Sequence, residues 1–288
     1  MQRDRWHGAA RWHRDLLRCN PVGMTLFAAV ILGAILGSFV NALSFRFNTG
    51  RSILWARSKS LGASRSRCMR CGHTLTALDL VPIFSYIALG GRCRFCGAHI
   101  SLQYPLVEAL AAALALGVYV LYPTGPLAYT LFLSAWMTIL FIVVYDLRHT
   151  VIPWSASGLL ALLAFVSLFL HGAPAASALL AGPLLAVPLF LLSLFSGGRW
   201  MGWGDSAFEL SLGWLLGATA GLSALFLAFW SGAIVGLILL GVSQLSWKSK
   251  RAGFTMKSEI PFAPFLALGA ALVFFFNVDF LSTLSVLF

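Results

Sequence analysis

Long apolar runs constrain what this chain can fold into more than any other feature. Runs of about 18 or more mostly apolar residues recur along its 288 residues, and roughly 20 helical residues cross a 30 Å hydrocarbon layer. Because lipid offers backbone groups no water and the runs do not alternate like barrel strands, helices are expected. We predict an all-α polytopic membrane protein of about eight transmembrane helices, near 24–44, 105–122, 127–145, 155–171, 177–195, 206–217, 220–245 and 261–281.

The net charge of +11 raises the question of a nucleic-acid partner. Apart from the N-terminal tail, however, every Lys and Arg falls in a connection on one side of the predicted bundle, and the opposite connections hold none. The basic connections are 45–104, Arg148, Arg199 and 247–257, and the opposite ones are 122–126 and 171–176. This distribution follows the positive-inside rule and predicts a cytoplasmic basic side. Membrane topology therefore explains the charge without nucleic acid.

The basic tail 1–23 does not fit this scheme, because its five arginines would lie opposite the basic loops. We expect either that the native chain starts at Met24 or that the tail lies along a membrane surface. A cleaved signal peptide is not expected, since the following apolar run is long and lacks a small-residue cleavage site. The mass of the native protein distinguishes the first two alternatives.

Four of the five cysteines form two C-x-x-C pairs, and a glycine follows each pair. They are Cys68, Cys71, Cys93 and Cys96. Two such knuckles about twenty residues apart have the spacing of a tetrahedral zinc-thiolate site. The alternatives are a redox dithiol and four unrelated cysteines. Because a four-thiolate site is closed, the zinc would be structural, and His73 and His99 would be surplus to it.

The loop 45–104 that carries these cysteines is too small and too polar to bury a core of its own. Metal ligation would supply the missing stability. Between the two cysteine pairs, residues 79–89 are apolar but too few to cross a membrane. We expect an interfacial or packed helix there.

Only nine acidic residues occur, and two follow or precede apolar runs on the basic side. Asp146 and Asp205 could be plain helix-end acids, with Asp205 an N-cap. As a facing pair they would share one proton and hydrolyse a peptide bond without a covalent intermediate. Gly202 and Gly204 would then let the backbone approach an extended substrate. For Glu108, the alternatives are a contact with a substrate amine and a plain helix-start acid.

An ordered set of motifs, from about Met24 to Ala270, resembles the type IV prepilin leader peptidase family. The set consists of Gly37-Ser38-Phe39-Val40-Asn41 with Arg46 after it, the loop 65–108, Asp146 followed by Pro153, the G-x-G-D signature Gly202-Trp203-Gly204-Asp205, and Pro261-Phe262-Ala263-Pro264 within 259–265. Each motif alone is weak, whereas the ordered set is specific.

This resemblance implies that Asp146 and Asp205 are the catalytic pair of a membrane aspartic endopeptidase in the prokaryotic inner membrane. Its substrates would be prepilins or pseudopilins of type IV pili or type II secretion, cut at the cytosolic face. Many relatives also methylate the new N-terminus, using S-adenosylmethionine and the zinc-containing loop. The expected organisation is tail 1–23, first transmembrane helix 24–44, zinc loop 45–104 and transmembrane peptidase domain 105–288.

Two positions depart from the family pattern. Ala207 stands where G-x-G-D-x-K has lysine, and Trp154 stands where aspartate usually follows the proline. Neither change removes a catalytic carboxylate. Two other functions remain as alternatives: a catalytically silent scaffold for pilus assembly, and a proton-coupled transporter in which the aspartates relay protons.

Overall fold

A computed structural model describes residues 21–47, 66–170, 173–245 and 261–279. Most of the tail with Cys19, part of the first loop and the basic stretch 247–257 lie outside these described residues. Within them the regular elements are helices, and the only strand-like pairing is two isolated β-bridges in the cysteine loop. The elements are α2 (Pro21–Arg46), η1 (Leu78–Leu80), α3 (Phe84–Ala88), α4 (Gln103–Leu121), α5 (Pro126–His149), α6 (Trp154–Ser167), α7 (Ala176–Ser196), α8 (Trp203–Leu216), α9 (Ala218–Leu245) and α10 (Ala263–Phe276).

Each of the eight predicted spans coincides with a helix, α2 or one of α4 to α10, which confirms an all-α multi-pass membrane protein. Five of the described helices are long and apolar enough to cross a membrane: Thr25–Arg46, Gln103–Leu121, Pro126–His149, Ala176–Ser196 and Ala218–Gly241. The helices α6, α8 and α10 have 14 residues each. At 1.5 Å per residue they are about 21 Å long, which is shorter than the hydrocarbon layer.

Local backbone geometry explains why some helices stop early. Thr150 ends α5 in the left-handed conformation (φ 50°), and Pro153 then caps the start of α6. Gly217 ends α8 with φ 89°, a conformation that favours glycine because it has no Cβ. These turns end the helices at positions that hydropathy alone does not indicate.

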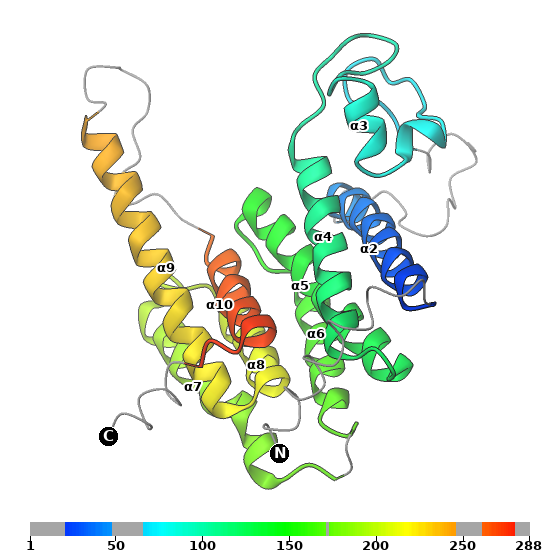
Figure 1. The fold of residues 1–288 in the computed structure, drawn as a ribbon. Coiled ribbons are helices and arrows are strands. Elements are labelled where there is room, and N and C mark those ends of the chain that lie inside the picture. Colours follow the sequence, from blue (N-terminus) through cyan, green and yellow to red (C-terminus); the bar gives the residue numbers. More distant parts are fainter. Residues whose placement is uncertain (1–20, 48–65, 171–172, 246–260, 280–288) are drawn as a thin grey trace, which may run out of the picture. The chain divides into compact units, whose positions relative to one another are not determined.

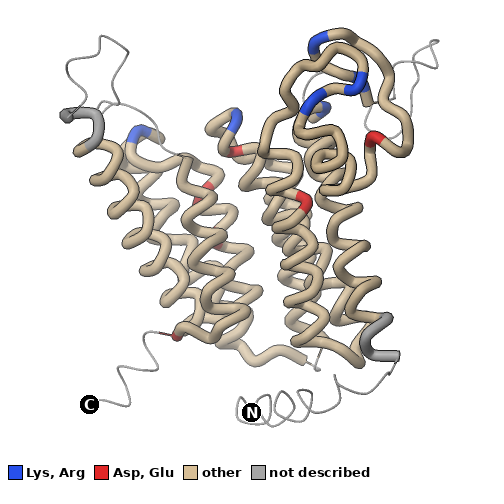
Figure 2. Tube along the Cα trace, turned by 45° about the horizontal axis from the view of Figure 1, so that its top comes forward, with Lys and Arg blue, Asp and Glu red and all other residues tan. Residues whose placement is uncertain are grey.

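The chain divides into two compact units, residues 1–123 and 124–288. In the first unit α2 and α4 lie side by side (Figure 1). Their backbones approach closely at Gly33 and Gly37. An added Cβ on Gly33 would lie 2.6 Å from the Ala111 oxygen, and one on Gly37 would lie 2.7 Å from the Ala111 Cβ. Among the described residues of this unit, most Lys and Arg lie on the loop that joins the two helices (Figure 2).

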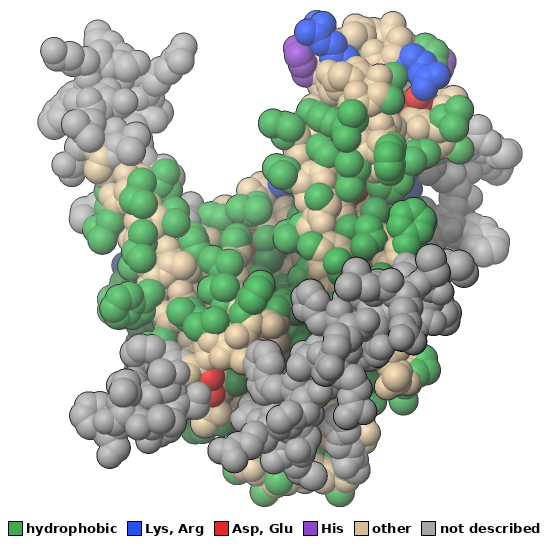
Figure 3. Space-filling model, viewed as in Figure 1, with side chains coloured by type: hydrophobic (Ala, Val, Ile, Leu, Met, Phe, Trp, Pro, Cys, Tyr) green, Lys and Arg blue, Asp and Glu red, His purple; other side chains and the backbone are tan. Residues whose placement is uncertain are grey.

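In the second unit α8 packs against α6, α7, α9 and α10. Its position at the centre of these helices places Asp205, near its start, inside the unit. Large side chains fill the interior around it: Trp136, Ile139, Ile142, Leu160, Phe208, Leu212 and Leu266 are all at most 2% exposed. Hydrophobic side chains also cover much of the outer surface of the helices (Figure 3), as expected for surfaces that face lipid.

Candidate functional site

Two matching turns carry the four cysteines of the first unit. In the first turn, Cys68 N–H donates to the His73 oxygen (2.9 Å) and Gly72 N–H donates to the Cys68 oxygen (2.9 Å). The turn 93–98 repeats both bonds. Gly72 and Gly97 have φ of 70° and 66°, which only glycine adopts without strain. The glycine after each pair thus closes the turn that brings its two thiols together.

The four cysteine thiols converge on one point. Their sulfur atoms all lie within 4.8 Å of one another, and the Cys68 and Cys96 sulfurs are 3.8 Å apart. Four thiolates around a tetrahedral zinc ion, each about 2.3 Å from it, are separated by about 3.8 Å. The cluster therefore fits a tetrahedral metal ion. Among the described residues, the cluster consists of these four cysteines and does not include His73 or His99.

Backbone amides favour the thiolate form of Cys68. The N–H groups of Cys71 and Arg70 point at its sulfur and lower the pKa of the Cys68 thiol to about 6. The thiolate is the form that binds metals. None of the four cysteines is bonded to another in a disulfide.

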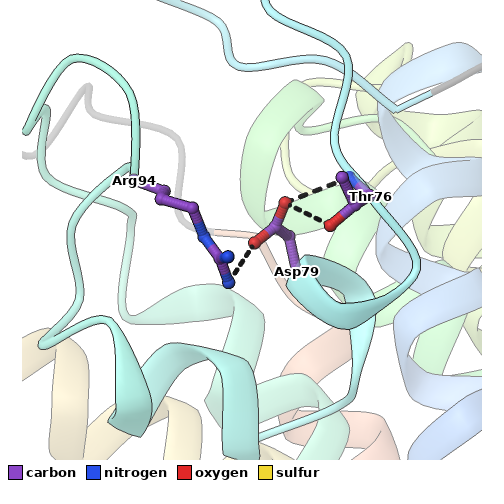
Figure 4. Close-up of polar contacts among 3 residues, drawn as sticks. All are labelled: Thr76, Asp79 and Arg94. Carbon is purple, nitrogen blue, oxygen red and sulfur yellow. Dashed lines mark hydrogen bonds and ion pairs between the residues drawn. The ribbon is translucent and has the colours of Figure 1, made fainter.

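Asp79 of η1 connects the segment between the cysteine pairs to the second pair (Figure 4). Its Oδ2 accepts hydrogen bonds from the Thr76 hydroxyl (2.7 Å) and the Thr76 N–H (3.0 Å). Its Oδ1 lies 3.0 Å from an Arg94 guanidinium nitrogen. The Thr76 hydroxyl and amide, and then the Arg94 charge, hold the pKa of the Asp79 carboxyl below its usual value. Because Arg94 lies between Cys93 and Cys96, this ion pair braces the second cysteine turn.

Glu108 of α4 attaches the cysteine loop to the helices of its unit. Its buried carboxylate accepts hydrogen bonds from the Ile83 N–H (2.8 Å) and from the Ser38 hydroxyl of α2. Ile83 itself has φ 62° and ψ −50°, and Phe84 N–H donates to the Pro82 oxygen (2.6 Å). That geometry is a γ-turn, which is strained for a β-branched residue. Glu108 is therefore an internal acceptor that holds a strained turn.

Asp146 lies in the last turn of α5 and is 4% exposed. Its Oδ2 accepts a hydrogen bond from the N–H of Ala263 (3.2 Å), the first residue of α10. The first N–H groups of a helix have no partner within it and favour a nearby negative charge. The stretch 261–264 thus provides the helix start that orients this carboxylate.

Asp205 is the third residue of α8 and is 8% exposed. It is not the N-cap, which is Gly202. The Asp205 Oδ2 accepts a hydrogen bond from Gly202 N–H (3.1 Å), and the Asp205 N–H donates to the Gly202 oxygen (3.2 Å). This reciprocal pair fixes the carboxylate at the start of the helix.

The two aspartates, which are far apart in sequence, lie near enough in space for one to act electrostatically on the other. The Asp146 charge acts on the Asp205 carboxyl, and α6 and α10 each pack against both α5 and α8. An added Cβ on Gly204 would lie 2.7 Å from the Ile152 Cβ. Glycine at 204 therefore lets the start of α8 approach the segment that follows α5, and this approach brings the carboxylates together.

Sequence reasoning overlooked Glu209, one helical turn after Asp205. Its side chain is 1% exposed, and neither carboxyl oxygen has a hydrogen-bond partner among the described residues. A single acid inside an apolar run is a signal that could have identified it, since such residues are costly in a membrane protein. The Ala263 amide was also overlooked, because it is a backbone group with no signature of its own in the sequence.

Comparison with known proteins identifies the family. Residues 31–122 match the bacterial peptidase A24 N-terminal domain. The chain is 32% identical to the prepilin leader peptidase/N-methyltransferase of Burkholderia pseudomallei, over 95% of this chain and 93% of that protein. The chain belongs to this family. Proteins of the same name from Pseudomonas aeruginosa (32% identity) and Stutzerimonas stutzeri (31%) each align with 88% of this chain and with 91% of their own length.

The two kinds of match differ in how much they cover of this prepilin leader peptidase/N-methyltransferase family member. The N-terminal domain match spans most of α2, the cysteine loop and α4. The full-length relatives extend beyond it into the second unit, which holds the carboxylate pair. No solved structure matches the chain.

Proposed function

We propose that this protein is a membrane aspartic endopeptidase that removes the leader from type IV prepilins or pseudopilins. One observation carries the proposal: two buried carboxylates, Asp146 and Asp205, are electrostatic neighbours, and a backbone N–H orients each of them. The names of the relatives supply the substrate class.

The chemistry needs the two carboxyl groups in opposite protonation states. Like charges this close disfavour double ionisation, so one proton is shared between the two groups. The ionised group takes a proton from a water molecule, whose oxygen attacks the scissile carbonyl. The neutral group donates its hydrogen bond to the carbonyl oxygen, and a proton then goes to the leaving amine. Gly202 and Gly204, at the start of α8, are proposed to lie along the extended substrate.

We place the reaction at the cytosolic face of the prokaryotic inner membrane. Arg148 follows Asp146 by two residues and Arg199 precedes Asp205 by six, so basic residues accompany the carboxylates at these helix ends. Basic connections lie in the cytoplasm by the positive-inside rule. A leader that is itself basic would be cut where it leaves the membrane.

A zinc ion held by Cys68, Cys71, Cys93 and Cys96 would be structural, because the four thiolates would fill its coordination sphere. Methylation of the new N-terminus is proposed as a second activity on the names of the relatives. S-adenosylmethionine would then be the methyl donor and would supply the methyl group to the freed amine.

The proposal is tested by incubating a prepilin with membranes that contain the wild-type protein, Asp146→Asn or Asp205→Asn. The masses of the products are then measured by mass spectrometry. Each asparagine keeps the size of the side chain but cannot hold the shared proton. We expect cleavage to fall roughly a hundred- to ten-thousandfold in each variant. A gain of about 14 Da on the product amine would establish methylation.

Asp279→Asn is the matched control. Asp279 follows α10, accepts a hydrogen bond from Ser223 (2.7 Å) and lies at the opposite end of α10 from Ala263. It should retain wild-type cleavage. If the wild type cuts no prepilin, or if either test variant still cuts at the wild-type rate, the two-aspartate mechanism is wrong. The scaffold alternative, motivated by Ala207 and Trp154, would then explain the chain better.

A further inference from the structure

The segment between the two cysteine pairs presents large apolar side chains to its surroundings. Leu78 is 71% exposed, Phe84 75% and Ile87 69%. Phe84 and Ile87 are three residues apart in α3 and therefore share one face of that helix. A patch of large apolar side chains of this kind marks a surface that something apolar covers.

The attachment of α3 fixes its level relative to the membrane. The 19 residues of α4 make a helix of about 28 Å, close to the hydrocarbon thickness, so its first residue lies near one boundary. Glu108 is five residues further along, about 7.5 Å, and helical side chains lean back toward the N-terminus. Its carboxylate accepts the Ile83 N–H. The residue before Phe84 is thus held within one side-chain length of the boundary.

Aromatic and basic groups mark the same boundary within this unit. The rings of Phe45 and Tyr104 stack with centroids 5.6 Å apart, and Asn41 donates its side-chain amide to the Tyr104 oxygen (3.2 Å). Arg46 occupies the last turn of α2. Aromatic rings and basic side chains collect where a bilayer meets water. The end of α2, the start of α4 and the turn before α3 therefore meet at the interface.

We propose that α3 lies on the surface of the bilayer and inserts Phe84 and Ile87 between the phospholipid headgroups and the acyl chains. Near the start of α4, Leu106 and Leu110 are also exposed, at 64% and 51%. Exposed basic residues of the same module, Arg70 and Arg92, complement anionic headgroups. The cysteine module is then held to the membrane by its own apolar face as well as by its two helices. This inference does not depend on the peptidase activity.

The test uses the full-length protein in vesicles of phosphatidylethanolamine and phosphatidylglycerol. A genetically encoded fluorescent amino acid, excited away from tryptophan, replaces Phe84, Ile87 or Met69 in turn. Met69 is the matched control, because it is also apolar and highly exposed (79%) but lies in the first cysteine turn. Spin-labelled lipids, with the label near the headgroup, serve as quenchers. We expect quenching at 84 and 87 about threefold or more above that at 69.

Three outcomes would overturn the proposal. Equal quenching at all three positions would mean that the whole module is immersed, without a preference for α3. Weak quenching with a water-like emission would mean that the patch is open to solvent. Weak quenching with a blue-shifted emission would mean that protein covers it. Bound zinc, measured in each labelled protein, verifies that the module is folded.

Discussion

Glu209 places a carboxyl group in the interior of the second unit with no hydrogen-bond partner for either oxygen among the described residues. A buried polar group without a partner costs about 1–3 kcal/mol. Glu209→Leu replaces it with an apolar side chain of similar volume. We expect this variant to be more stable by about 1–3 kcal/mol, seen as a higher midpoint of thermal unfolding in detergent.

Glu209→Gln is the control, since it keeps a polar group in the same place and should bring little or no gain in stability. Cleavage of a prepilin by both variants should stay close to wild type if the residue has only a structural effect. A Glu209→Leu protein that remains folded but no longer cuts would contradict this interpretation. It would instead assign the carboxyl group to the chemistry of the neighbouring Asp205.

At the level of single residues, the sequence predicted features that depend on short-range geometry better than contacts between distant segments. The convergence of the cysteines follows from two local turns, and their spacing revealed it. The hydrogen bond from Ala263 to Asp146 joins residues 117 positions apart, and it depends on how α10 packs against α5. The bond from Ile83 to Glu108 likewise requires a strained turn, which no propensity of isoleucine predicts.

At the level of elements, the contact between α2 and α4 depends on two glycines. An added Cβ on Gly37 would lie 2.7 Å from the Ala111 Cβ and 2.8 Å from the Glu108 Cα. Because one of these atoms belongs to the backbone, Gly37→Ala must push the helices apart. We expect a loss of stability of about 1–3 kcal/mol, measured by unfolding of the reconstituted protein.

Gly158→Ala provides the matched comparison for this prediction. Gly158 also lies within a helix, but an added Cβ there meets nothing within 4 Å. Alanine is the better helix former by about 1 kcal/mol, so Gly158→Ala should stabilise the protein where Gly37→Ala destabilises it. The same sign for both variants would show that helix propensity, and not the approach of α2 to α4, decides the effect.

The positions of the helices could be predicted from hydropathy because every helix of a multi-pass protein must offer an apolar surface to lipid or to its neighbours. Their lengths could be predicted less well, since spans of 155–171 and 261–281 were expected where α6 and α10 have 14 residues each. The apolar runs around α6, α8 and α10 differ little in composition from those of the longer helices. Gly217 ends α8, and Asn277, with φ 52°, ends α10; neither of these caps follows from hydropathy.

At the level of the whole molecule, each compact unit carries one kind of chemistry. The first, residues 1–123, contains the cysteine cluster, and the second, residues 124–288, contains Asp146 and Asp205. The division follows α4, which sequence reasoning had grouped with the peptidase domain. Its extensive packing on α2, together with Glu108, explains why α4 belongs with the cysteine loop.

This separation predicts that metal removal unfolds one part of the protein and spares the other. Structural zinc sites contribute on the order of 10–16 kcal/mol of apparent binding free energy, and within 66–102 only Gly91, Cys93 and Ala98 are buried. A strong chelator, or Cys71→Ser, should abolish stoichiometric zinc and amide-exchange protection in residues 66–102. Protection in α5 to α10 should be unchanged. His73→Ala should retain the zinc, because His73 lies outside the four-thiolate cluster. If exchange rises equally in both units when zinc is lost, the two units fold as one, and the carboxylate pair then depends on the metal.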